Sequence, residues 1–263
     1  MLHGHMKFSM RLLPLILTLS FCHPGLLAKE KASTPAPAAW KLPDYSNLLT
    51  LIPAPPTMGS PAEKADLDGV LAMQNNASPE VIAHAEQTVG FNVFSFSEVL
   101  GPQFTPETHP KTAEFFARLE TTANLPKNYL KDYYRRLRPY RAFPDLVKVL
   151  VTKEDGYSYP SGHSTRAWLF ALVLGALDQS DRNDFLSSAL QVCQDRVIGG
   201  MHFPSDVLES RVLAEEIFAN LLVNKDFMAD LAKLHREEWM TIPAHNSVKK
   251  NPSEEILEKP AFR

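Results

Sequence analysis

The stretch YPSGHSTRAWLFALVLGAL, residues 159–177, places a polar cluster directly before an apolar helix. Ser161 is a natural N-cap, and the apolar residues from Trp168 to Leu177 predict a helix. Gly162 lets a ligand approach the backbone, and the first free N–H groups of a helix point at whatever lies in front of them. The stretch therefore predicts an anion site beside a titratable group, His163. A capped helix with an exposed histidine is the simpler alternative.

The rest of the chain also has helical patterns. Helices should begin at Ser60-Pro61, with a capping box closed by Glu63, and at Ser78-Pro79. Prolines 110 and 126 should open two further helices, which end at Thr122 and Leu137. Apolar residues spaced by three and four predict helices over 163–178, 182–197, 205–223 and 226–239. Because alternating strand patterns and hairpin signals are missing, the sequence predicts an all-α fold with one compact, bundle-like helical domain.

The N-terminus has the layout of a secretory signal peptide over residues 1–28. Basic residues precede an apolar run, Leu12 to Phe21, and the small Ala28 follows before a charged segment. The run is too short to span a bilayer as a stable helix. We therefore expect a periplasmic or secreted protein that loses Cys22 and keeps Cys193 without a disulfide partner. A lipoprotein cleaved before Cys22 is the weaker alternative, because a bulky phenylalanine precedes that cysteine.

Composition divides the remaining chain and limits its partners. A proline-rich arm is expected over residues 29–60, the helical domain over 61–242 and a polar tail over 243–263. The 27 Lys and Arg residues against 30 Asp and Glu give a net charge of −3, which removal of Lys7 and Arg11 with the signal lowers to −5. This charge argues against a nucleic-acid polymer as partner, and 44% hydrophobic residues argue against a disordered or many-span membrane protein.

A cationic cluster, KDYYRRLRP, occupies residues 131–139. On a helix, Lys131, Arg135 and Arg138 would lie along one face because they are four and three residues apart, and Pro139 would end the helix. Such a stripe can hold a phosphate, since arginine offers a planar fork and lysine a point charge. A solvated basic face is the simpler explanation for this run when it is taken alone.

A third cluster, RVIGGMHFPSD, occupies residues 196–206. The glycine pair should stop one helix and Pro204 should begin the next, so that His202 lies in the connection. Asp206 could accept the proton of one ring nitrogen and leave the other nitrogen with its lone pair. His202 is therefore a candidate nucleophile or base, although a His/Asp pair of this spacing is more often a local surface pair.

The three clusters in this order, Lys-x6-Arg-Pro, Pro-Ser-Gly-His and Arg-x5-His-x3-Asp, resemble the signature of the type-2 phosphatidic acid phosphatase and vanadium haloperoxidase superfamily. Within it, the exported bacterial class A non-specific acid phosphatases are most similar, over roughly Pro43 to Leu234. Membrane lipid phosphatases need several long apolar spans, which this sequence lacks, and haloperoxidases are usually much longer.

The resemblance implies a metal-independent acid phosphatase that hydrolyses small phosphate monoesters, needs no cofactor and is inhibited by vanadate. His202 would be the nucleophile that forms a phosphohistidine, Asp206 would orient it, and His163 would be the general acid. The phosphoryl oxygens would be bound by Lys131, Arg138, Ser161, Gly162 and Arg196. Since one histidine must be neutral and the other protonated, the rate should follow a bell with its maximum on the acidic side.

Two departures from the family pattern concern charge. Asp195 stands where the family usually has serine, and it could pair with a site cation and weaken phosphate binding. Arg166 is an additional positive charge that could contact a second substrate group or face solvent, and we expect it to face solvent. The same two alternatives apply to Arg135, Arg136 and Arg141.

Other functions stay open at this stage. The protein could act on a lipid-linked phosphate at a membrane face without stable insertion, transfer phosphate to alcohols, or oxidise halides with bound vanadate. A catalytically silent protein that binds phosphate or vanadate belongs to a different class. The sequence also leaves the oligomeric state open, a homo-oligomer included.

Overall fold

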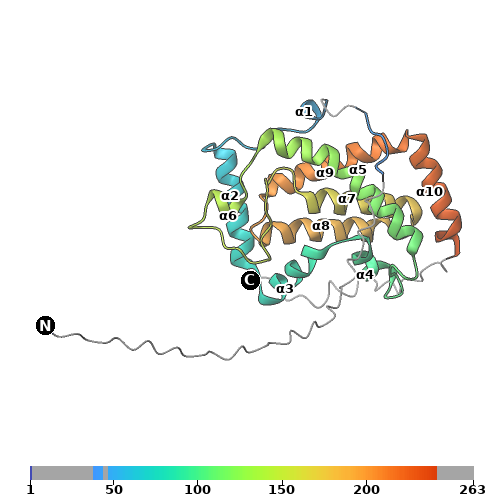
Figure 1. Cartoon of the computed structure of the whole chain (residues 1–263), viewed down its shortest axis with the longest axis horizontal. Helices are drawn as coiled ribbons and strands as arrows, with labels where there is room; N and C mark the ends of the chain where they lie inside the picture. The colour runs from blue at the N-terminus through green and yellow to red at the C-terminus, as the bar shows by residue number, and fades with distance from the viewer. Residues whose placement is uncertain (2–37, 44–46, 242–263) are drawn as a thin grey trace, which may run out of the picture. The chain divides into compact units, whose positions relative to one another are not determined.

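The computed structural model describes residues 1, 38–43 and 47–241 of the chain. In these ranges every regular element is a helix (Figure 1), which confirms the predicted all-α fold. The predicted signal peptide and the polar tail from 243 onward lie outside the described residues, so both remain predictions. No helix in the described ranges combines the length and the hydrophobicity that crossing a membrane requires.

The predicted starts of the first long helices are confirmed. Helix α2 (Pro61–Asn76) begins after Ser60, whose hydroxyl accepts the N–H of Glu63 at 3.1 Å. Helix α3 (Pro79–Gln87) begins after Ser78 in the same way. The capping box at α2 closes one residue earlier than expected, because the carboxylate of Glu63 accepts the N–H of Gly59.

The described parts of the arm before α2 are residues 38–43, which pack on the helical domain, and a segment from residue 47 that contains the short helix α1 (Leu48–Leu51). Trp40 is only 2% exposed, and its ring contacts those of Phe115 and Phe227. The indole N–H of Trp40 donates to Asp230 at 3.0 Å. Burial of this large side chain holds residues 38–43 against α5 (Pro110–Tyr134) and α10 (Lys225–Glu237).

The prediction of two helices between residues 110 and 137 is wrong. One helix, α5 (Pro110–Tyr134), covers this segment with Pro126 inside it. A proline in a helix interior removes one backbone hydrogen bond and costs about 3 kcal/mol. The buried residues Leu119, Ala123 and Leu130 on the core-facing side of α5 offset that cost by packing against the rest of the domain.

The prediction that Lys131, Arg135 and Arg138 form a cationic stripe on one helix is also wrong. The helix ends at Tyr134, because Arg135 adopts a left-handed backbone conformation with φ of 48°. Arg135 is exposed, whereas Arg138 lies beyond the helix in extended conformation and is buried. Pro139 does not end a helix but begins the short helix α6 (Pro139–Ala142). Lys131 and Arg138 therefore belong to different elements.

Helix α7 (Gly162–Leu177) is the central element and packs mainly against α8 (Arg182–Ile198) and α9 (Pro204–Leu222), as Figure 1 shows. Most of its residues are buried, which agrees with the nearly continuous apolar stretch in its sequence. The last long helix, α10 (Lys225–Glu237), packs against α5 and α9. These four helices match their predicted ranges within a few residues at each end.

Short elements complete the described part of the chain: η2 (Thr88–Gly90), η3 (Val93–Phe96), α4 (Ser97–Leu100) and η4 (Trp239–Thr241). The glycine pair after α8 ends that helix as predicted, and Gly200 has φ of +76°. A side chain at Gly200 would also meet the carbonyl of Lys148 at 2.3 Å. The chain therefore turns sharply here and places the following residues at the N-terminus of α9.

Candidate active site

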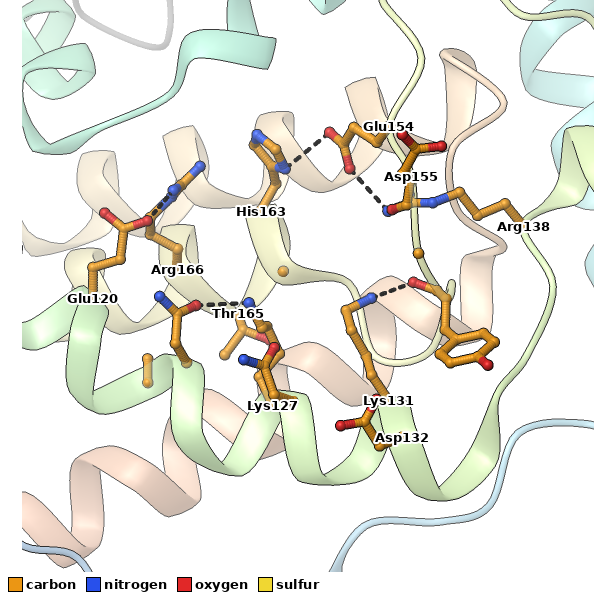
Figure 2. A pocket seen from close by; sticks show the side chains of 16 residues that line it. Glu120, Lys127, Lys131, Asp132, Arg138, Glu154, Asp155, His163, Thr165 and Arg166 are labelled. Atoms are coloured by element: carbon orange, nitrogen blue, oxygen red, sulfur yellow. Dashed lines mark hydrogen bonds and ion pairs between the residues drawn. The ribbon is translucent and has the colours of Figure 1, made fainter.

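A cavity of about 470 Å³ lies between α5 and the N-terminal half of α7 (Figure 2). Four of the eight predicted site residues line it: Lys131, Arg138, Gly162 and His163. The other four are fully buried: Ser161, Arg196, His202 and Asp206. Arg138 contacts His202, and Glu154 contacts both His163 and Arg196. The structure therefore brings together all three sequence clusters.

The carboxylate of Glu154 lies among the predicted phosphate-binding side chains. Its Oε1 accepts from Nη2 of Arg196 at 2.6 Å and lies 3.2 Å from Nδ1 of His163. Its Oε2 lies 3.1 Å from Nη2 of Arg138 (Figure 2). Burial alone would raise the pKa of Glu154, but His163, Arg196, His202 and Arg138 outweigh burial and lower this pKa to about 2. An anion is thus stable at this position.

Lys131 is directed at the loop that precedes α7. Its ammonium donates to the carbonyl of Tyr157 at 2.5 Å and to that of Ser158 at 3.3 Å. Burial, with a contribution from Arg138, lowers the pKa of Lys131 to about 7, although Asp206 and Glu154 oppose the shift. A bound dianion would favour the charged form of this lysine.

Hydrogen-bond donors around His202 determine which ring nitrogen carries the proton. Nε2 lies 3.1 Å from Nη1 of Arg138, and a guanidinium can only donate, so Nε2 accepts with its lone pair. The proton is then on Nδ1, which lies 3.4 Å from Oγ of Ser158 and 3.6 Å from Oδ2 of Asp206. Burial, followed by Arg138 and Lys131, lowers the pKa of His202 well below its ordinary value. The ring is therefore neutral, and the lone pair on its unprotonated Nε2 accepts from Arg138.

Three hydrogen-bond donors contact the carboxylate of Asp206, which also lies close to His202. The hydroxyl of Ser158 donates to Oδ2 at 2.5 Å, and the backbone N–H of Phe203 donates to the same oxygen at 2.8 Å. Nη1 of Arg136 donates to Oδ1 at 2.6 Å. Because Ser158 lies between Asp206 and Nδ1 of His202, the serine hydroxyl completes the contact that the spacing of the motif predicts.

Arg136 is not a solvent-facing residue, contrary to the expectation from sequence. Its side chain is only 8% exposed and forms ion pairs with both Asp206 and Asp66. The guanidinium also lies 4.0 Å from the centre of the Phe203 ring. Asp66 in turn accepts the backbone N–H of Ser205 at 3.0 Å, which ties α2 to the N-terminus of α9.

Ser161 caps α7 as predicted. Its Oγ accepts from the backbone N–H of Ser164 at 3.3 Å and from the hydroxyl of the same residue at 2.9 Å. The hydroxyl proton of Ser161 has no acceptor within the described ranges, so it can be donated to a ligand. Gly162 follows at the first position of α7, where an added Cβ would approach Cδ of Lys127 to 3.3 Å.

His163 lies between two acceptors. Its Nε2 donates to the carbonyl of Val89 at 3.0 Å, and its Nδ1 faces Glu154. Burial is the largest influence on His163 and lowers its pKa, Arg196 and Arg166 add to the lowering, and Glu154 opposes it. The pair of Glu154 and His163 therefore binds its shared proton only at acidic pH and loses it as the pH rises.

The remaining charged residues of the motifs have separate surroundings. Asp195 does not pair with a site cation: its Oδ1 accepts from Gln191 at 3.0 Å and its Oδ2 lies 3.1 Å from Nδ1 of His84. Arg166 was expected to face solvent, and this expectation is wrong. The side chain lines the cavity and pairs with Glu120. Arg141 is exposed and pairs with Asp155.

Residues 117–224, which contain all three clusters, match the family model of the PAP2 superfamily. The match to this family model agrees with the family predicted from the three motifs. It is 29% identical to a non-specific acid phosphatase of Providencia stuartii over 198 residues, which cover 72% of this chain and 79% of the relative.

A non-specific acid phosphatase of Salmonella typhimurium is 28% identical over 230 residues, which cover 83% of this chain and 91% of the relative. Among solved structures, the chain is similar to a transmembrane PAP2 type phosphatidylglycerolphosphate phosphatase from Bacillus subtilis. That similarity has a TM-score of 0.45 at 24% identity and covers 65% of this chain and 89% of the other.

Proposed function

We propose that this protein is an exported acid phosphatase that hydrolyses phosphate monoesters through a phosphohistidine, without a metal ion. The observation that carries the proposal is the convergence of Arg138, Arg196 and His163 on the single carboxylate of Glu154. These donors surround an anion next to His202, whose Nε2 keeps its lone pair. The names of the acid phosphatase relatives and the predicted signal peptide support the same function.

In the proposed first step, phosphate takes the place of the Glu154 carboxylate. Lys131, Arg138 and Arg196, together with the N-terminus of α7, stabilise charge on the phosphoryl oxygens. The lone pair of Nε2 of His202 forms a bond to phosphorus while the bond from phosphorus to the ester oxygen breaks. His163 gives its proton to the departing alcohol oxygen.

In the second step, neutral His163 takes a proton from water, and the water oxygen attacks phosphorus. The bond from phosphorus to nitrogen breaks, and its electron pair returns to Nε2 of His202. Asp206, through Ser158 and its own carboxylate, stabilises the positive charge on the histidine in both steps. Inorganic phosphate then leaves, and Glu154 can return to the cations.

Turnover of nucleotide, sugar and lipid phosphates in the presence of a chelator tests the substrate class and the independence from metal. We expect hydrolysis of small phosphate monoesters and undiminished rates with chelator. His202→Ala should abolish turnover and acid-quenched phosphoenzyme labelling, while His163→Ala should slow esters of poor leaving groups more than p-nitrophenyl phosphate. Full activity in His202→Ala would refute the proposed nucleophile, and hydrolysis of lipid phosphates alone would assign the protein to a lipid substrate.

A further inference from the structure

The cavity continues past the phosphate-binding end along one side of α5. Lys131, Lys127 and Asn124 follow one another at spacings of four and three residues, so they share this side of the helix. Across the cavity, His163 and Arg166 lie one turn apart on α7 (Figure 2). The proposed leaving-group acid, His163, therefore borders a region that the phosphoryl group does not need.

Lys127 is a cation of this region without an anionic partner in the described part of the chain. Its ammonium donates to the amide oxygen of Asn124 at 2.6 Å and forms no ion pair there. It lies 3.7 Å from the position that a Cβ on Gly162 would occupy, so it faces the start of α7. Burial and then Arg166 lower the pKa of Lys127, and neither Glu120 nor Glu154 reverses the shift. A bound anion would stabilise this ammonium.

Arg166 adds a donor on the opposite wall. One of its terminal nitrogens pairs with Glu120, so that carboxylate balances its charge. Its Nε is buried and has no hydrogen-bond partner in the described part of the chain. Because this nitrogen is covered by other atoms, Arg166 would contact a ligand through the part of its side chain that lines the cavity.

We propose that Lys127, assisted by Asn124 and Arg166, forms a second anion-binding subsite. This subsite binds a carboxylate or phosphate group on the alcohol portion of the substrate. The inference rests on the proposed function: if His163 protonates the departing alcohol, the alcohol portion of the substrate extends past His163 toward Lys127. The substrate class is then a small monoester with two anionic groups, such as a phosphorylated hydroxy acid or a bisphosphate. This part of the cavity is lined by charged and amide side chains, including the carboxylates of Glu120 and Asp132, and such a wall does not suit acyl chains.

A matched pair of esters tests the subsite. Glycerol 3-phosphate and 3-phosphoglycerate share a three-carbon skeleton and differ at one end by a carboxylate. In wild type we expect kcat/KM to be about tenfold higher for 3-phosphoglycerate, the equivalent of about 1.4 kcal/mol of additional interaction. In Lys127→Gln this preference should fall to within about twofold, mainly through a higher KM for 3-phosphoglycerate.

Three controls separate charge recognition from damage to the fold. Lys127→Arg should retain the preference because the charge remains, whereas Lys64→Gln on the exposed side of α2 should leave both esters unchanged. The thermal midpoint of each variant verifies that it is folded. An equal loss for both esters in folded Lys127→Gln, or a wild type without preference for 3-phosphoglycerate, would overturn the subsite.

Failure of the proposed function gives a different result. If wild type hydrolyses neither ester, calorimetric binding of the two compounds still tests the subsite, since binding requires no turnover. Tighter binding of 3-phosphoglycerate that Lys127→Gln abolishes would support the subsite, and equal affinities would refute it.

Discussion

The carboxylate of Glu154 lies 2.6 Å from the guanidinium of Arg196, a residue 42 positions further along the chain. The same carboxylate contacts Arg138 and His163, so one side chain of the protein engages three of the groups predicted to act on phosphate. The loop around it is held by its backbone, because the carbonyl of Glu154 accepts from the hydroxyl of Tyr140. Rotation of the Glu154 side chain alone can therefore free the cations for a substrate.

Replacing this carboxylate should strengthen phosphate binding. In Glu154→Gln the cations lose their internal anion, so inorganic phosphate and monoester substrates no longer compete with a negative charge. We expect the KM and the inhibition constant of phosphate to fall by about tenfold, the equivalent of about 1.4 kcal/mol. Initial-rate kinetics with phosphate as inhibitor measure both constants.

Glu215→Gln is the matched control, because Glu215 is exposed and, among the described residues, its ion pair is with Arg211 on the same helix. That variant should keep the wild-type constants, as exposed pairs contribute little. A higher KM in Glu154→Gln would contradict displacement and would instead make Glu154 a residue that supports substrate binding.

The dependence of the rate on pH should be set mainly by His163. The reaction needs His202 neutral and His163 protonated, and burial lowers the pKa of both. His202 is thus neutral over most of the acidic range, while His163 loses its proton as the pH rises past its lowered pKa. We expect kcat/KM for glycerol 3-phosphate to be greatest below the ordinary histidine pKa of about 6.5 and to decline toward neutral pH.

Glu154→Gln distinguishes this cause from ionisation of the substrate. Glu154 opposes the lowering of the His163 pKa, so its removal should shift the alkaline limb of kcat/KM to lower pH. A limb set by the second ionisation of the phosphate ester would stay in place. An unshifted profile in Glu154→Gln would therefore remove His163 from the role of general acid in the free enzyme.

Arg136 should contribute more to stability and to turnover than its neighbour Arg135. Removing one partner of a buried ion pair leaves uncompensated charge, which costs about 3 to 5 kcal/mol. Arg136→Gln would leave both Asp66 and Asp206 without their shared cation. We expect a loss of about 3 kcal/mol in the free energy of unfolding, measured by urea titration, and a lower kcat at unchanged protein concentration.

Arg135→Gln makes the same chemical change one residue earlier, at an exposed side chain. Within the described ranges its side chain donates a single hydrogen bond, to the carbonyl of Asp132 in the last turn of α5. The free energy of unfolding should therefore change by no more than about 0.5 kcal/mol. Equal losses in the two variants would mean that the buried ion pairs of Arg136 do not stabilise the fold.

Local sequence signals predicted the helices well wherever the signal and the packing agree. Ser60, Ser78 and Ser161 cap the helices that their sequences predict, and the glycine pair after α8 ends that helix. Pro126 misled the prediction, because burial of one side of α5 overrides the local cost of a proline. The left-handed conformation of Arg135 has no signal in the sequence, since that backbone state normally favours glycine.

The site was predictable where motif spacing carries the information. The resemblance of the three motifs to a known family selected the eight candidate residues, and the fold brings them together, although their roles stay predictions. Glu154 and Ser158 were missed, because the connection from α6 to α7 has no periodicity and their partners are distant in sequence. Arg136 lies between α5 and α6, and its burial was missed because its partner Asp206 is 70 residues away in sequence. A carboxylate four residues before Ser158 is unremarkable until folding places it against Arg196.

Ser158 should affect turnover more than substrate binding. Its hydroxyl donates to Asp206 and lies 3.4 Å from Nδ1 of His202, whereas the direct separation of His202 and Asp206 is 3.6 Å. Ser158→Ala removes this link and leaves the histidine less well oriented, so kcat for p-nitrophenyl phosphate should fall by about tenfold to a hundredfold while KM changes little. Ser187→Ala, at an exposed serine on α8, is the control and should retain wild-type kinetics. A rise in KM at constant kcat would assign Ser158 to phosphate binding instead of to the orientation of His202.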